Sequence, residues 1–173
     1  MLFRSPVAIE RYFGLLSDVS RSANARTELD IKEVRFRNAT VRQSTPASNG
    51  SITFGTDIDI SFDYETEQFK DQDIEFRVGV KLPTGIVASM MRFRRRARAS
   101  EHLSLQVRDP RFVPGTYFLN IAACPIGADV HIGGISNATS FRVEPPTAGD
   151  YRFEYGQEYM VLFDYTVNGE RQA

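Results

Sequence analysis

The sequence is dominated by an alternation of apolar and polar residues that begins near residue 28 and continues almost to the C-terminus. Successive side chains of a β-strand point to opposite faces, so a period of two predicts strands with one buried and one wet face. No helical period follows residue 27, and the body of the chain is therefore expected to be all-β. The alternating apolar residues expected in the core are Ile58, Ile60, Phe62, Ile74, Phe76, Val78, Val80, Tyr117, Leu119 and Ile121.

The pattern predicts short strands that are separated by turns rich in Gly, Pro, Asn and Asp. Such strands suit two packed antiparallel sheets, whereas a parallel sheet needs crossover helices between its strands. We therefore expect an immunoglobulin-like antiparallel β-sandwich, with one short N-terminal helix and a C-terminal extension strand. The predicted strands are 29–36, 57–64, 74–81, 86–93, 103–108, 116–123, 140–143 and 159–165.

One helix is predicted near the N-terminus. Its apolar residues recur at helical spacing between residues 6 and 19, Ser5 can cap its first turn, and Pro6 suits the first helical position. The chain then divides into a helical linker at 1–27 and one sandwich at 28–173, of which 146–173 supplies the last strand.

The bulk composition excludes several classes of partner and chemistry. The chain has 173 residues, with 21 basic and 22 acidic side chains, so it lacks the basic surplus that nucleic acid or an anionic membrane favours. Cys124 is the only cysteine, and we expect a buried core thiol and not half of a disulfide. No apolar run is long enough to span a bilayer and residues 1–5 open no signal peptide, which favours a cytoplasmic location.

No constellation of residues predicts catalysis, a metal or a cofactor. The only histidines, His102 and His131, lie in no nucleophile motif, and Gly133-Gly134 lacks the spacing of a phosphate-binding loop. The acidic run at 57–61 begins like an EF-hand loop but alternates as a strand. Further carboxylates cluster around one hairpin at 63–75, where solvated turn residues are favoured over a glycosidase pair.

Turn chemistry is expected at several asparagines and at one Pro-Gly pair. Tripeptides of the form Asn-x-Ser/Thr begin at Asn38, Asn49 and Asn137, and we favour turns there over glycan acceptors. Pro114-Gly115 directly precedes a predicted strand, so Tyr117 can reach back to the backbone as a tyrosine corner does.

Arginines crowd residues 92–98, at positions 92, 94, 95, 96 and 98. Such a run could contact the phosphate of a lipid carrier, a nucleic acid or an acidic sugar. A solvated loop is favoured over these functional alternatives.

The wet face of two predicted strands has the composition of a sugar-binding surface. Sugars pack a ring face against an apolar side chain while planar amide and guanidinium groups satisfy their hydroxyls. Phe118, Asn120, Arg77 and Arg142 supply that mixture. The residues predicted to bind carbohydrate are Arg77, Gly79, Lys81, Phe118, Asn120, Ser140 and Arg142.

Aromatic residues are frequent beyond Pro145-Pro146 and need a surface to cover. A last strand there can pair with an edge of its own sheet or with an edge of a second copy, and exchange between two copies is favoured. The residues predicted at such a dimer interface are Tyr155, Tyr159, Val161, Phe163 and Tyr165.

The succession of segments 52–64, 76–81, 113–121 and 137–143 resembles the C-terminal carbohydrate-binding domain of Wzt-type O-antigen polysaccharide ABC transporter ATP-binding proteins. Residues 5–12 are similar to the linker that follows the nucleotide-binding domain of that family. The resemblance implies that 1–27 is a linker from an ATPase domain missing from this chain. The arginines of 92–98 depart from the family pattern.

The resemblance also implies a function. It implies non-catalytic recognition of an undecaprenyl-linked O-polysaccharide at its non-reducing end, a homodimer with exchanged C-terminal strands, and attachment to an inner-membrane transporter through the missing ATPase. The chain would then be cytoplasmic and peripheral to the bacterial inner membrane, and nucleic acid is not an expected partner. A structural dimerisation domain without glycan recognition, or a carbohydrate-active enzyme, are the alternatives.

Overall fold

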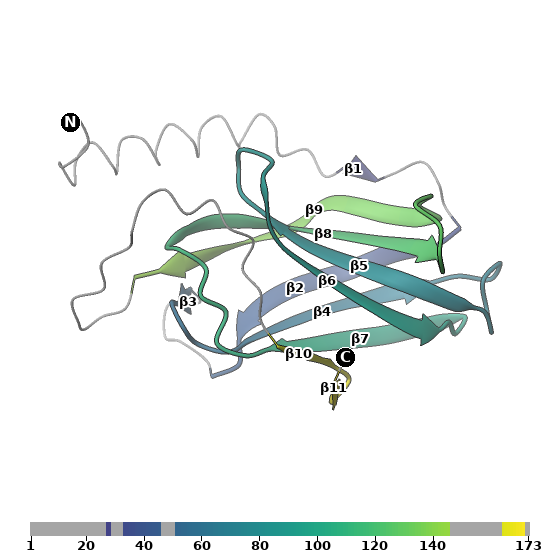
Figure 1. The fold of residues 1–173 in the computed structure, drawn as a ribbon, viewed down its shortest axis with the longest axis horizontal. Coiled ribbons are helices and arrows are strands. Elements are labelled where there is room, and N and C mark those ends of the chain that lie inside the picture. The colour runs from purple at the N-terminus through teal and green to yellow at the C-terminus, as the bar shows by residue number, and fades with distance from the viewer. Residues whose placement is uncertain (1–26, 29–32, 46–50, 146–163, 172–173) are drawn as a thin grey trace.

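The computed structural model describes residues 27–28, 33–45, 51–145 and 164–171, and every regular element in these ranges is a β-strand (Figure 1). The all-β prediction is therefore confirmed for this part of the chain. The predicted helix at 6–19 lies outside it. The strands are β1 Thr27–Glu28, β2 Arg35–Gln43, β3 Ile52–Thr53, β4 Ile58–Glu65, β5 Asp73–Lys81, β6 Val87–Arg96, β7 Ser100–Val107, β8 Gly115–Pro125, β9 Gly133–Glu144, β10 Tyr165–Val167 and β11 Glu170–Arg171.

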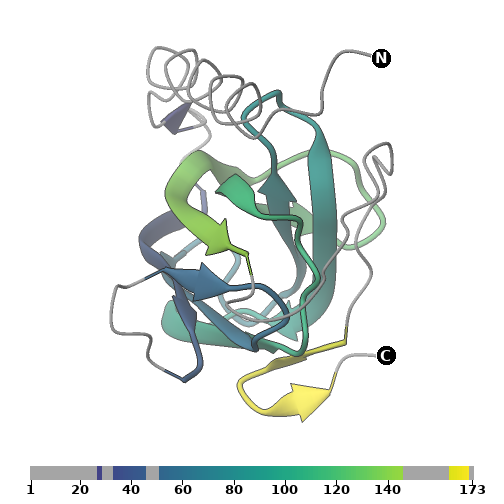
Figure 2. The ribbon, with the colours of Figure 1, turned by 90° about the vertical axis from the view of Figure 1, so that its left-hand side faces the viewer.

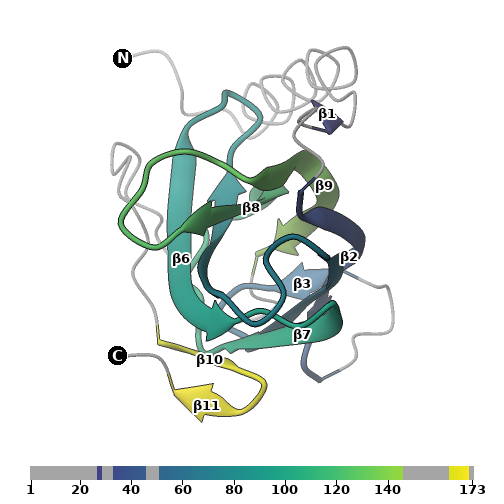
Figure 3. The ribbon, with the colours of Figure 1, turned by 90° about the vertical axis from the view of Figure 1, so that its right-hand side faces the viewer.

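The strands form two sheets that enclose the core, as the two end-on views show (Figure 2, Figure 3). Sheet A has the order β1-β9-β8-β5-β6, and β3 pairs in parallel with β9. Sheet B has the order β11-β10-β7-β4-β2. The predicted strand 140–143 is confirmed but too short, since β9 begins at Gly133. The predicted strand 29–36 agrees with β2 only at 35–36, and its first four residues lie outside the described part of the chain.

The core is made by the alternating residues that the sequence predicted. Ile58, Ile60 and Phe62 of β4 are fully buried, as are their counterparts on β5. Phe76 lies at the centre of an aromatic cluster and stacks on Phe93 with 5.3 Å between the ring centroids. Burial of such rings is a large part of the stabilisation of a small sandwich. The cluster consists of Phe36, Phe62, Tyr64, Phe76 and Phe93.

The tyrosine corner is confirmed. Tyr117 is buried, and its hydroxyl donates a hydrogen bond of 2.7 Å to the carbonyl oxygen of Val113. Burial raises the pKa of Tyr117, which keeps the phenol protonated and able to donate. Cys124 is buried and free, as expected, but it lies beside Glu75 on the outer side of sheet A.

The open edge between the sheets is closed where β2 meets β9. The amide of Val34 donates to the carbonyl of Ile132 over 3.1 Å, and further along β9 the strand β3 pairs with Val143. Gly133 permits the first contact, because an added Cβ would lie 2.1 Å from the carbonyl oxygen of Val34. Between these two contacts, β2 and β9 lie side by side at the edge of the sandwich (Figure 3).

Replacement of Gly133 by alanine is expected to break this closure. Gly133→Ala places a methyl group against the backbone of Val34. We expect it to lower the free energy of unfolding by more than about 3 kcal/mol in urea titrations. Gly79→Ala is the matched control, because its Cβ meets only the flexible Met90 side chain at 3.2 Å and should cost less than about 1 kcal/mol. Equal losses in both variants would contradict the assigned role of Gly133.

Candidate functional site

The outer face of sheet A brings together the residues predicted to bind carbohydrate. Cross-strand pairing places Phe118 between Lys81 and Ser140, and it places Gly79 beside Asn120. The pairing of Arg142 with Thr116 and of Arg77 with Ala122 puts both guanidinium-bearing residues on this same face. Sugar binding by this set stays a prediction.

At one end of this face, the loop between β8 and β9 is bound to Arg77. The Nε of Arg77 donates to Glu75 over 2.8 Å, and its Nη2 donates to the Ala128 carbonyl and to Asp129, each over 3.3 Å. The bond to Glu75 raises the pKa of Arg77. Since its side chain is only 15% exposed, Arg77 serves here to hold the β8–β9 loop against sheet A.

The middle of the face is not exposed to solvent, contrary to expectation. Phe118 is 6% exposed and Gly79 is buried, so the ring of Phe118 offers no open platform for a sugar. Alternation assigns a residue to a face but does not report whether that face is covered. The open end holds Ser140 and Arg142, whose guanidinium contacts Glu144 at 2.9 Å and is 70% exposed.

Asn120 shapes the adjacent strand. Its Oδ1 accepts a hydrogen bond of 2.8 Å from the backbone amide of Asn137. Three residues of β9, 136–138, lie opposite Asn120 alone, which makes a bulge in which Asn137 has a positive φ of 53°. The prediction of a turn at Asn137 is therefore wrong, because the residue lies inside a strand.

A second bulge, with one extra residue instead of two, interrupts β2. Asn38 also has a φ of 53°, and with Ala39 it lies opposite Phe62 alone. The turn expected at Asn38 is wrong for the same reason, and Asn49 lies outside the described residues. Both bulges carry the same tripeptide, Asn-Ala-Thr, at 38–40 and 137–139. This repetition is visible in the sequence and is the signal by which the two bulges could be found.

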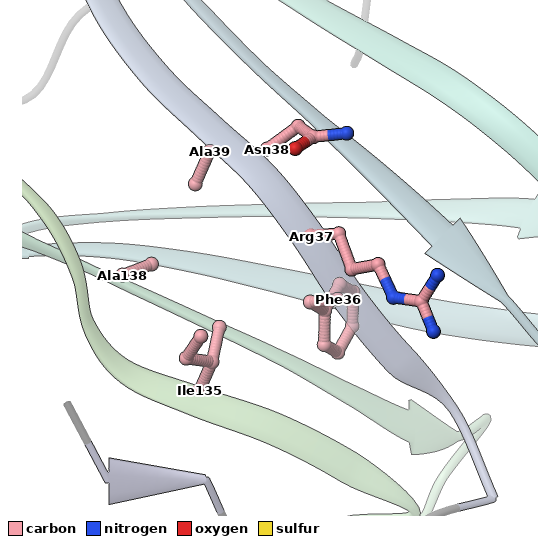
Figure 4. A pocket seen from close by; sticks show the side chains of 6 residues that line it. All are labelled: Phe36, Arg37, Asn38, Ala39, Ile135 and Ala138. Atoms are coloured by element: carbon pink, nitrogen blue, oxygen red, sulfur yellow. The ribbon is translucent and has the colours of Figure 1, made fainter.

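The two bulges border a hollow of about 200 Å³ between β2 and β9 (Figure 4). The side chains of Ala39, Ala138 and Ile135 lie between the two strands, and the two alanines leave the space that larger residues would fill. Its lining residues are Phe36, Arg37, Asn38, Ala39, Ile135 and Ala138. Of these, Phe36 and Ile135 are buried, whereas Arg37 and Asn38 are exposed at its rim.

A polar cluster lies beside the hollow on the outer face of sheet B. Asp63 accepts hydrogen bonds of 2.6 Å from the Nδ2 of Asn38 and from the Nδ1 of His102. These bonds, that from Asn38 first, lower the pKa of Asp63. Arg37 donates to Glu65 over 3.2 Å. Within the described ranges, no three His, Cys, Asp or Glu side chains gather in the way that metal ligands do.

The low pKa of Asp63 predicts a pH dependence of stability. A carboxyl with a depressed pKa in the folded chain stabilises the fold above its unfolded pKa, near 4, and the contribution is lost as the pH falls through the folded value. We expect wild type to be more stable than Asp63→Asn at about pH 6, with the difference shrinking towards about pH 2. Urea unfolding at several pH values measures this, with Asp59→Asn as control for loss of one charge. A difference that stays constant with pH would contradict the prediction.

The arginine run forms a strand, and the expectation of a solvated loop is wrong for residues 92–96. Arg95 donates to Glu101 through two nitrogens, over 3.1 and 2.6 Å, and this pairing raises the pKa of Arg95. Arg94 lies 3.9 Å from Glu75. Acidic residues on neighbouring strands thus balance part of the run, which favours a structural role for those arginines.

Of the residues predicted at a dimer interface, only Tyr165 lies in the described part of the chain. It begins β10, which pairs with β7 of the same chain. Its hydroxyl accepts from the backbone amide of Arg92 over 3.0 Å and donates to the carbonyl of Arg92. Tyr165 therefore joins the edges of the two sheets, and a role between two copies stays a prediction.

No protein-family model matches the sequence, and neither does any curated protein. The crystal structure of the C-terminal domain of wzt is similar to this structure over 80% of this chain and 88% of that chain, with a TM-score of 0.57 and 9% sequence identity. The chain shares the fold of that domain. Within the described residues, no helix has the length and hydropathy needed to cross a membrane.

Two other solved structures match only in part. The alkylpurine DNA glycosylase AlkC of Pseudomonas fluorescens, bound to DNA with an abasic site analogue, has a TM-score of 0.41 and 20% identity, over 65% of this chain and 30% of that one. A β-glucosidase from Listeria innocua in complex with glucose has a TM-score of 0.40 and 7% identity, over 64% and 16%. Neither likeness carries an argument about function.

Proposed function

We propose that this chain is a non-catalytic carbohydrate-binding domain that recognises the non-reducing end of an O-antigen polysaccharide for export by an ABC transporter. The observation that carries the proposal is the shared fold with the C-terminal domain of wzt over most of both chains. In this role the domain lies on the cytoplasmic side of the inner membrane and is joined to the transporter through an ATPase domain.

The chemistry of the outer face of sheet A supports this function. Its open end presents the hydroxyl of Ser140 and the guanidinium of Arg142 on β9 and, across Phe118 of β8, the ammonium of Lys81 on β5. Such groups donate hydrogen bonds to sugar hydroxyls in pairs and need no metal or nucleophile to do so. The face is thus suited to binding without reaction.

We also infer an immunoglobulin-like connection of the strands. Three strands, β2-β4-β7, face four strands, β9-β8-β5-β6. These seven strands follow one another along the chain as in an immunoglobulin-like sandwich. The fourth of the seven is β6, and it lies in the same sheet as β5. This arrangement leaves β7 free to receive an additional strand at its side.

A structural dimerisation domain is the second candidate, and the position of β10 favours it. Within residues 164–171, Tyr165–Val167 pair with β7 at the side of sheet B. The same strand of a second copy could take this place, because the edge of a sheet accepts either. Normal export after the exposed polar side chains on the outer face of sheet A have been replaced by alanine would support this candidate.

Titration calorimetry with the O-polysaccharide of the encoding bacterium and with unrelated polysaccharides tests the proposed function. We expect binding of the first alone, and Arg142→Ala should weaken it about 10-fold, the equivalent of about 1.4 kcal/mol. Arg42→Ala, which removes an exposed arginine from β2, is the matched control and should bind as wild type does. Equal binding of all polymers, binding of none, or their hydrolysis by the protein would overturn the proposal.

A further inference from the structure

We propose that the hairpin of β5 and β6 docks on the headgroups of anionic phospholipids. The arginine row of β6, which is Arg92, Arg94 and Arg96, contacts the headgroup phosphates. The apolar tip of the hairpin, residues 82–87, enters the interface between headgroups and acyl chains. This inference goes beyond the proposed function and does not rest on it.

The hairpin is the basic part of a chain that is otherwise acidic. Between Glu75 and Glu101 the sequence has seven basic residues and no acidic one, whereas the whole chain has 21 basic and 22 acidic side chains. The even overall balance argued against an anionic partner, but it hides this uneven distribution. Basic segments of this kind are attracted to the negative surface of a membrane that contains anionic lipids.

Three of these basic residues lie in a row on the outer face of sheet A. Alternation along β6 places Arg92, Arg94 and Arg96 on the face that Arg77 and Glu75 of β5 share. All three arginines of the row are exposed, and neighbours in the row are about 7 Å apart along the strand. Since β6 is the last described strand of sheet A, the row borders an open side of the sheet, where a broad surface can approach.

The carboxylates near the row leave part of its charge without a partner. Glu75 is bound by Arg77 at 2.8 Å and reaches Arg94 only at 3.9 Å. Arg92 lies opposite Arg77, which is another cation, and like charges in opposite positions destabilise a sheet. Among the described residues, neither Arg92 nor Arg96 has an ion pair through its side chain. An anion from outside the chain would therefore stabilise the row.

The turn that joins β5 to β6 exposes apolar side chains. Ile86 is 44% exposed and Val87 is 43% exposed, and the hairpin projects beyond β8 and β9 (Figure 1). The amide of Leu82 donates to the Ile86 carbonyl over 2.8 Å and that of Gly85 donates to the Leu82 carbonyl over 2.9 Å, which fixes the turn. Because Val87 pairs with Lys81, its side chain lies on the same face as the arginine row.

A lipid surface fits both parts of the hairpin. Phosphate oxygens accept hydrogen bonds from arginine in pairs, and the interface of a bilayer takes up apolar side chains beside such cations. Nucleic acid offers phosphates but no apolar phase for Ile86 and Val87. The proposed contact is with the lipid itself, and it is separate from any attachment through an ATPase domain.

Co-sedimentation with vesicles tests the proposal. We expect wild type to bind vesicles of phosphatidylcholine and phosphatidylglycerol in equal parts, to bind phosphatidylcholine alone much more weakly, and to be released as the salt concentration rises. Each cation close to an anionic surface contributes about five-fold to binding. Replacement of the arginine row should therefore weaken binding at least about 10-fold, in the triple variant Arg92→Gln, Arg94→Gln and Arg96→Gln.

The matched control removes three exposed arginines from β2 and should bind nearly as wild type does, in the triple variant Arg35→Gln, Arg37→Gln and Arg42→Gln. Urea unfolding checks that both triple variants are folded. No binding of anionic vesicles by wild type, or an equal loss in both triple variants, would overturn the proposal. So would equally tight binding of a short DNA duplex, or release by inorganic phosphate beyond that caused by sodium chloride of the same ionic strength. None of these outcomes bears on polysaccharide binding.

Fluorescence reports on the apolar tip, because the chain contains no tryptophan. Ile86→Trp should shift its emission to shorter wavelengths when anionic vesicles are added, since the side chain leaves water. Val113→Trp is the matched control, because Val113 is 45% exposed but lies in the β7–β8 loop, and its emission should not shift. An unchanged emission of Ile86→Trp, or an equal shift in both variants, would contradict the docking of the hairpin.

Discussion

The structure depends on the close approach of β2 to β9, which turns two separate sheets into one enclosed core. Backbone meets backbone where Val34 contacts Ile132, and only a residue without a side chain fits at Gly133. This contact fixes the distance between the sheets at one edge. The aromatic cluster around Phe76 fills the interior that this contact helps to enclose.

Alternation predicted the strands wherever the chain alternates without interruption, as at Ile58, Ile60 and Phe62. It missed most of β2, because the bulge adds one residue and shifts the apolar positions to the other face after Asn38. In β9 it missed the residues before and within the bulge, 133–139. The faces on which the residues of β5 and β8 lie also followed from alternation. The burial of Phe118 did not, since coverage of a sheet face is decided by segments far away in the sequence.

The candidate site, too, was predictable where it depends on local pattern and unpredictable where it depends on tertiary contacts. Its sugar-binding composition could be predicted from residue types, and the shared face of Lys81 and Ser140 could be predicted from the period of two. The engagement of Arg77 by Asp129 and the hollow at the bulges could not, because both depend on tertiary contacts that leave no local pattern. The repeated Asn-Ala-Thr tripeptide was visible, but a tripeptide alone does not distinguish a turn from a strand interrupted by a bulge.

The bond between Tyr165 and the backbone of Arg92 has a consequence for solubility. β6 is the last described strand of sheet A, and the backbone groups on the outer side of such a strand can recruit another chain. Tyr165 occupies both the donor and the acceptor of Arg92 with a single hydroxyl. Tyr165, which lies 73 residues after Arg92 in the sequence, thus covers this strand, so during synthesis the strand stays uncovered until residue 165 has been made.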